Sequence, residues 1–131
     1  MMRGESVLIA GAGYLGTRLA SELIAAGYDV TVLRRRPQVL AGAKIYQADL
    51  LDPASLQQLP LCQHLVYCVS PDNSQEHAYR SAYYTALQNL IHAFELRGAQ
   101  PHIAFSSSTS VYGETSGAWV SEDEQLSLIH I

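Results

Sequence analysis

Short apolar runs alternate along this chain with segments whose apolar residues recur at helical spacing. The apolar runs predict five strands, at residues 6–10, 29–33, 44–47, 64–69 and 101–106. The segments between them predict helices at residues 15–26, 53–59 and 76–97. This alternation is typical of an α/β domain with a parallel sheet and helices on both of its faces.

Turn and capping residues support these boundaries. Gly27 and Gly98 follow the first and the longest predicted helix, and glycine commonly ends a helix. Asp52 precedes Pro53, which is the expected order of an N-cap and a first helical residue. Right-handed crossovers then allow the strand order 3-2-1-4-5. We therefore predict a Rossmann-type, doubly wound sheet with a ligand across the carboxyl ends of strands one and four.

The longest predicted helix carries two adjacent tyrosines, Tyr83 and Tyr84, near Leu87, Leu90 and Ile91. This spacing fits a stripe that faces the core, so we interpret the tyrosines as packing residues.

A glycine motif, Gly11-Ala12-Gly13-Tyr14-Leu15-Gly16, joins the first predicted strand to the first predicted helix. In a G-x-G-x-x-G turn the first glycine permits a tight turn and the second lets a pyrophosphate approach the backbone. The third lets the helix pack against the strand. The free amides of the first helical turn, with Tyr14 and Leu15, then face the anion. The motif predicts a dinucleotide site, and a plain strand–turn–helix is the alternative.

The end of the second predicted strand indicates which dinucleotide would bind. An NAD site usually has an acidic residue about 20 residues after the first glycines, where it binds the ribose 2′-hydroxyl. Residues 30–44 contain no carboxylate and include Arg34, Arg35 and Arg36. Guanidinium groups pair with phosphate oxygens, so we predict NADP rather than NAD, with Arg34 and Arg35 at the ligand and Arg36 in solvent. A solvated basic turn is the alternative.

Composition narrows the class of protein. The 131 residues are enough for one domain, and their net charge of −4, with eight basic residues in no long stripe, argues against a nucleic-acid partner. No stretch resembles a signal peptide or a membrane span. Cys62 and Cys68 lack a second pair of metal ligands, and His77 and His92 have no partner at metal spacing. We expect a cytoplasmic chain without a metal site.

The last six residues have a separate origin in our interpretation. Residues 126–131 read as the translation of a transposon-type sequencing adapter, so the gene fragment would end near Gln125 and the natural protein would continue past it. A natural apolar terminus is the alternative. We expect residues 1–125 to form a partial NAD(P)-binding domain, truncated before the remaining strands and the substrate region of a complete enzyme.

A loop rich in hydroxyl groups, Ser-Ser-Ser-Thr-Ser-Val-Tyr-Gly at residues 106–113, follows the fifth predicted strand. Hydroxyls at this place would lie beside the nicotinamide, where a serine can hydrogen-bond a substrate oxygen. Together with the glycine motif and the pair Asp49-Leu50, this loop resembles the extended or atypical short-chain dehydrogenases/reductases. The most similar group is the NAD(P)-dependent epimerase/dehydratase family, and the resemblance covers nearly the whole chain up to Gln125.

The resemblance implies roles for individual residues. Ser108 matches the catalytic Ser/Thr of the family. Asp49 and Leu50 match the pair beside the adenine, with a turn or helix cap as the alternative role for Asp49. Val69 and Ser70 match the end of the fourth strand, which passes the cofactor ribose.

Two features depart from the family. Its catalytic centre is an acid/base tyrosine with a lysine four residues later, whereas Lys44 is the only lysine here and no tyrosine has a lysine at that spacing. Tyr112 belongs to the Val-Tyr-Gly motif and is not that tyrosine, which would lie beyond this chain or be absent. A position that holds a structural asparagine in many members holds Tyr83 here.

These observations predict the NADP-binding portion of a short-chain reductase or of an epimerase- or dehydratase-like oxidoreductase. Its substrate would be a small molecule, with nucleotide sugars as one candidate class. In the intact parent, hydride would pass between substrate and nicotinamide, and the isolated chain is expected to bind the cofactor without turnover. A non-catalytic NADP-binding sensor or regulatory module is the alternative. An FAD-binding domain is a third reading, against which the arginines argue.

Overall fold

The computed structural model describes residues 4–106, apart from residues 12, 37 and 74. Its strands are β1 (Ser6–Ala10), β2 (Asp29–Arg34), β3 (Lys44–Gln47), β4 (His64–Tyr67) and β5 (His102–Phe105). Its helices are α1 (Tyr14–Ala25), the 3₁₀-helix η1 (Pro53–Leu56), and a continuous helical run made of α2 (Glu76–Arg80), the π-turn η2 (Ser81–Thr85) and α3 (Ala86–Leu96). The strands form one parallel sheet in the order β3-β2-β1-β4-β5, which confirms the predicted topology.

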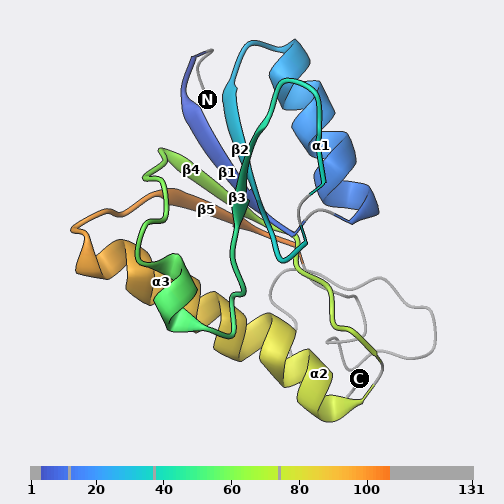
Figure 1. The fold of residues 1–131 in the computed structure, drawn as a ribbon, viewed down its shortest axis with the longest axis vertical. Coiled ribbons are helices and arrows are strands. Elements are labelled where there is room, and N and C mark those ends of the chain that lie inside the picture. Colours follow the sequence, from blue (N-terminus) through green and yellow to red (C-terminus); the bar gives the residue numbers. More distant parts are fainter. Residues whose placement is uncertain (1–3, 12, 37, 74, 107–131) are drawn as a thin grey trace, which may run out of the picture.

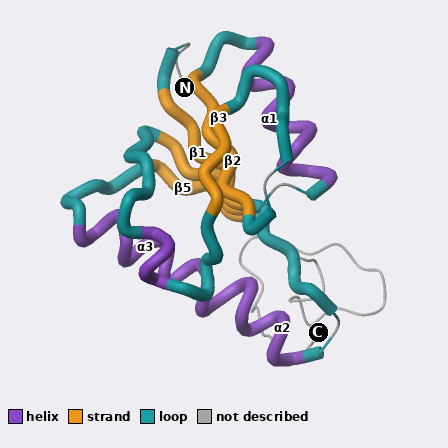
Figure 2. The backbone as a smooth tube through the Cα atoms, in the orientation of Figure 1, coloured by secondary structure: helices purple, strands orange, loops and turns teal. Residues whose placement is uncertain are grey.

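Helices cover both faces of this sheet, as Figures 1 and 2 show. The central strand β1 supplies both cores, because side chains alternate between the two faces of a strand. Val7 and Ile9 join the core that includes residues of α1, whereas Leu8 and Ala10 join the core that includes residues of α3. The sheet is therefore packed against a hydrophobic core on each of its two faces.

The helical run of α2, η2 and α3 packs against the sheet through a row of residues spaced four apart. The buried members of this row are Ala78, Ala82, Ala86, Leu90 and Phe94. Tyr84, which we expected to face the core, is 50% exposed, and Tyr83 is partly buried with its ring edge-on to Phe105. Tyr84 is two residues from both Ala82 and Ala86, which places it on about the opposite side of the helix from the buried row.

The helix predicted after Asp52 is much shorter than expected, since only the 3₁₀-helix η1 forms. Asp52 caps it as predicted, with Oδ1 accepting the amide of Ala54 at 3.2 Å. The carbonyl of Ser55 accepts a hydrogen bond from the hydroxyl of Tyr46 at 2.8 Å. This bond takes the place of the bond to an amide four residues later that a longer α-helix would form. Pro60, which has no amide hydrogen, prevents continuation further along the chain.

Tyr67 links the sheet to the π-turn η2. Its side chain is fully buried, and its hydroxyl donates a hydrogen bond to the carbonyl of Ala82. Burial raises the pKa of Tyr67 well above its ordinary value, and neighbouring Tyr83 adds to this shift. The phenol therefore remains a neutral donor at physiological pH.

Removal of this donor should destabilise the domain. We expect Tyr67→Phe to lower the free energy of unfolding by about 1–2 kcal/mol, because the Ala82 carbonyl loses its partner in a buried place. Urea denaturation measures this change. Tyr84→Phe removes the same atom from a half-exposed side chain and serves as the control, with an expected change within about 0.5 kcal/mol. Equal losses in the two variants would contradict the role of Tyr67.

Candidate functional site

A pocket of about 730 Å³ opens at the carboxyl ends of the parallel strands. Its lining comes from residues 11 and 13 after β1, 33–36 at the end of β2, 48–51 after β3, 68–73 after β4, and one face of the helical run from His77 to Ala86. The strand order reverses between β1 and β4, which is where open α/β sheets bind their ligands. The volume is that of a site for a small molecule or cofactor.

Two glycines let the turn after β1 lie close to its neighbours. A Cβ atom on Gly11, whose φ is +94°, would lie 2.7 Å from the peptide that joins Cys68 to Val69. A Cβ atom on Gly16 would lie 2.1 Å from the carbonyl oxygen of Gly11. The first and third glycines of the motif therefore have steric reasons to lack a side chain, as predicted from their spacing.

The second glycine has a different environment. A Cβ atom on Gly13 would meet nothing within 4 Å, and Gly13 is both the N-cap of α1 and part of the pocket lining. No side chain caps α1, and its first turn carries no acidic residue. The open space beside uncapped helix amides fits a pyrophosphate laid against the backbone.

Tyr14 and Leu15 begin α1, directly after Gly13 in the pocket lining. Their side chains are 83% and 52% exposed, and neither contributes to the pocket lining. Any contact with a bound phosphate therefore falls to the amides of the first turn of α1. The assignment of these two residues as cofactor contacts stays a prediction.

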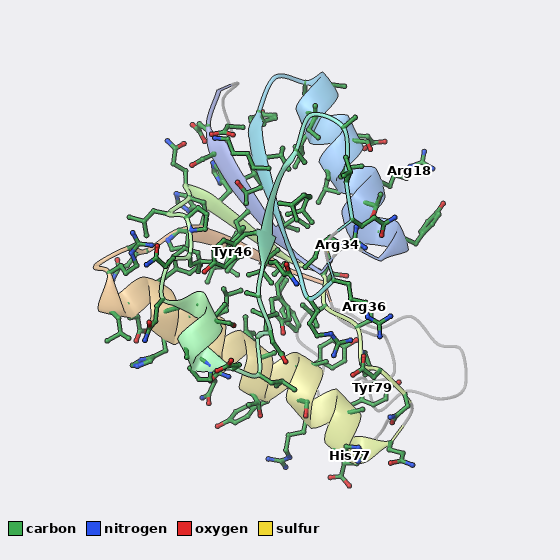
Figure 3. The ribbon with its side chains drawn as sticks, in the orientation of Figure 1. Arg18, Arg34, Arg36, Tyr46, His77 and Tyr79 are labelled. Atoms are coloured by element: carbon green, nitrogen blue, oxygen red, sulfur yellow. The ribbon has the colours of Figure 1, made fainter. Side chains whose placement is uncertain are left out.

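All three arginines at the end of β2 line the pocket. Arg36 is exposed, so its expected place in solvent is compatible with its position at the pocket. The strand ends at Arg34, so the alternation that would separate neighbouring side chains no longer applies to the next two residues. Figure 3 shows Arg34 and Arg36 near the carboxyl ends of the strands. Arg34 donates from Nη2 to Oε1 of Gln38 at 2.6 Å, and Arg35 forms an ion pair with Asp72 at 3.2 Å.

Asp49 and Leu50, which follow β3, also line the pocket. Leu50 is almost fully buried, and its carbonyl accepts the side-chain amide of Asn89 at 2.8 Å. Asp49 Oδ1 accepts the amide of Leu51 at 2.9 Å, so this carboxylate caps a local turn at the same time as it borders the pocket. The two roles weighed for Asp49 from the sequence are compatible in space.

Val69 and Ser70 line the pocket because β4 ends at Tyr67, two residues earlier than predicted. The amide of Cys68 bonds the last carbonyl of β1, on Ala10, at 2.8 Å, and the chain then leaves the sheet. Cys68 is partly buried and borders the pocket, and this burial raises the pKa of its thiol.

Several lining residues escaped the analysis of the sequence. The segment 71–73 after β4 brings Pro71, Asp72 and Asn73 to the pocket, and its position at the reversal of strand order could have indicated this. The helical wall, which includes His77 and Ser81, carries no motif and follows only from how the helix packs.

Other predictions fall outside the described part of the chain. Ser108, Tyr112 and the predicted adapter-derived tail at 126–131 all lie beyond residue 106. Within the described residues, no group of three or more histidine, cysteine or acidic side chains is placed to hold a metal ion. None of the helices described is both long enough and apolar enough to cross a bilayer.

Comparison with protein families matches residues 7–129 to the model of the NAD dependent epimerase/dehydratase family. The chain belongs to this family. The strand order, the glycine turn and the pocket at the strand ends are thus those of a nucleotide-binding fold shared by oxidoreductases and epimerases.

Solved structures agree with this assignment. A Methylobacillus flagellatus protein assigned as an NAD-dependent epimerase/dehydratase is 36% identical, with a TM-score of 0.75, over 93% of this chain and 44% of its own. Uronate dehydrogenase from Agrobacterium tumefaciens, solved as a mutant complexed with NAD, is 25% identical with a TM-score of 0.69, and the match covers 85% of this chain and 43% of that protein. MoeE5, solved with UDP-glucose and NAD, is 26% identical with a TM-score of 0.71, and the match covers 93% of this chain and 42% of that protein. The chain spans less than half the length of each. A search of curated proteins found no match.

The space around Gly16 and Gly13 predicts that substitutions at these two positions of the motif differ in their effect on stability. Gly16→Ala should lower the free energy of unfolding by about 2–3 kcal/mol, because backbone must move to relieve the contact with Gly11. Gly13→Ser should stay within about 0.5 kcal/mol of the original chain, since serine is a good N-cap and has room there. Chemical denaturation measures both, and a stable Gly16→Ala variant would show that the close approach is not required.

Proposed function

We propose that this chain binds NADP and forms the cofactor-binding part of an oxidoreductase, epimerase or dehydratase that acts on a small molecule such as a nucleotide sugar. The observation that carries this proposal is the convergence of the glycine turn and three arginines on one pocket. Family membership supports a nicotinamide dinucleotide, and the arginines support the phosphorylated form.

The lining divides into places for the parts of the cofactor. The amides at the start of α1 would hold the pyrophosphate, and Arg34 with Arg35 would hold the 2′-phosphate. Leu50 would lie beside the adenine and Val69 beside a ribose. When bound, the nicotinamide supplies a carrier for hydride, and the residues of this chain bind and orient it.

The only lysine of the chain is remote from this pocket. Lys44 begins β3, at the amino end of the sheet, and pairs with Asp29 at 3.4 Å. The tyrosine–lysine pair expected of the family therefore has no lysine available from these 131 residues, so we expect cofactor binding without turnover. The catalytic role of Ser108 rests on the family resemblance alone.

The lack of a lysine among the described residues of the pocket lining also fits a second candidate, a non-catalytic NADP-binding sensor or regulatory module. The coding sequence downstream of residue 125 distinguishes the two. A Tyr-x-x-x-Lys pair there supports the enzyme, and its absence supports the module. The UDP-glucose and NAD in the structure of MoeE5 favour the enzyme and a sugar substrate.

Dinucleotide titrations test the proposed cofactor. We expect Arg34→Ala with Arg35→Ala to weaken NADPH binding about 10- to 100-fold, because charge-assisted hydrogen bonds to the 2′-phosphate are lost, with NADH binding changed less than about threefold. Isothermal titration calorimetry or the fluorescence of bound NADPH measures the two affinities.

Arg18→Ala is the matched control. Arg18 carries the same charge on the exposed side of α1, where it pairs with Glu22 at 3.7 Å (Figure 3). Its loss should leave both affinities unchanged. Equal weakening of NADPH and NADH in the double variant would contradict the preference for NADP, and failure of the original chain to bind either would contradict the dinucleotide site.

A further inference from the structure

An ion pair connects two walls of the pocket. Arg35 follows β2 and Asp72 follows β4, and Nη2 of Arg35 lies 3.2 Å from Oδ1 of Asp72. In the sheet β1 lies between these two strands, so the pair joins loops on either side of the strand that ends in the glycine turn. Both residues belong to the pocket lining.

Solvent reaches this ion pair readily. The side chains of Arg35 and Asp72 are 54% and 68% exposed, and exposed pairs of this kind contribute little to folding stability. The contact can therefore open without disturbing the fold. Its effect is instead on the charges of the pocket, because it pairs the Arg35 guanidinium with the Asp72 carboxylate.

Asp72 pairs with Arg35, one of the arginines that would bind a 2′-phosphate. Arg34 donates to the neutral amide of Gln38, and among the described residues neither Arg34 nor Arg36 forms an ion pair. A phosphate that approached Arg35 would have to displace Asp72 or share the guanidinium with it, and the two anions would repel one another. NAD has a hydroxyl at this position and meets no such conflict.

We propose that Asp72 is a specificity-determining residue, an internal anion that competes with the cofactor 2′-phosphate for Arg35 and so narrows the preference for NADP over NAD. This inference rests on the proposed function, because it concerns the same pocket and the same arginines. The pair is closed with NAD bound and opens when NADP binds.

The substitution Asp72→Asn tests the competition directly, because it keeps the shape of the side chain and removes its charge. NADPH should bind about 3- to 10-fold more tightly, as expected when an exposed like charge is removed beside a phosphate, whereas NADH should change less than about twofold. The pair of probes 2′,5′-ADP and 5′-AMP should show the same contrast, which confines the effect to the 2′-phosphate. Calorimetry gives all four affinities.

Asp29→Asn is the matched control. Asp29 is also an exposed aspartate in an ion pair, with Lys44, and it lies at the opposite end of the strands from the pocket. This variant has the same change in net charge and should leave all four affinities unchanged. An equal gain in both aspartate variants would reduce the effect to overall charge and overturn the proposal.

A double-mutant cycle with Arg35→Ala isolates the pairing. In that background Asp72→Asn should favour NADPH much less, because the contested guanidinium is gone and only the repulsion between Asp72 and the phosphate remains. If Asp72→Asn leaves NADPH binding unchanged while the Arg34/Arg35 double variant still loses it, the inference fails and the proposed function stands. If the original chain binds neither dinucleotide, both fail.

Discussion

The close contact between the turn after β1 and its neighbours determines how this molecule is built. Gly16 rests against the carbonyl of Gly11, and Gly11 rests against the peptide that follows Cys68. The first contact places the amino end of α1 at the carboxyl edge of the sheet, where its N-cap Gly13 lines the pocket. The second places the loop after β4 beside that helix end. One sterically demanding turn thus positions two walls of the site.

The charges of the pocket follow from this arrangement. Three guanidinium groups and the amino end of α1 are electropositive, and the two lining carboxylates, Asp49 and Asp72, each have a partner. The partners differ in kind. Asp49 accepts a backbone amide and is part of the turn, so its release would disrupt the local fold. Asp72 pairs with an exposed side chain that can move, so it can respond to a ligand.

Local patterns predicted much of the fold and failed at identifiable places. β1 and β3 lie at the predicted residues, and the strand order agrees, because apolar runs and handed crossovers are properties of the chain alone. The short η1 arises because Tyr46 takes the carbonyl of Ser55, a contact between segments that no local pattern records. Tyr84 lies outside the core because it is on about the opposite side of the helix from the buried row.

The amino-acid sequence by itself determined the class of fold, the glycine turn and the arginine cluster, since each depends on residue type and spacing within one short segment. Only the tertiary structure decided that Arg36 joins the pocket lining, that β4 stops at Tyr67, and that Asp72 reaches Arg35. These contacts join segments far apart in the chain. They depend on the three-dimensional packing of the strands, which spacing along a single sequence does not contain.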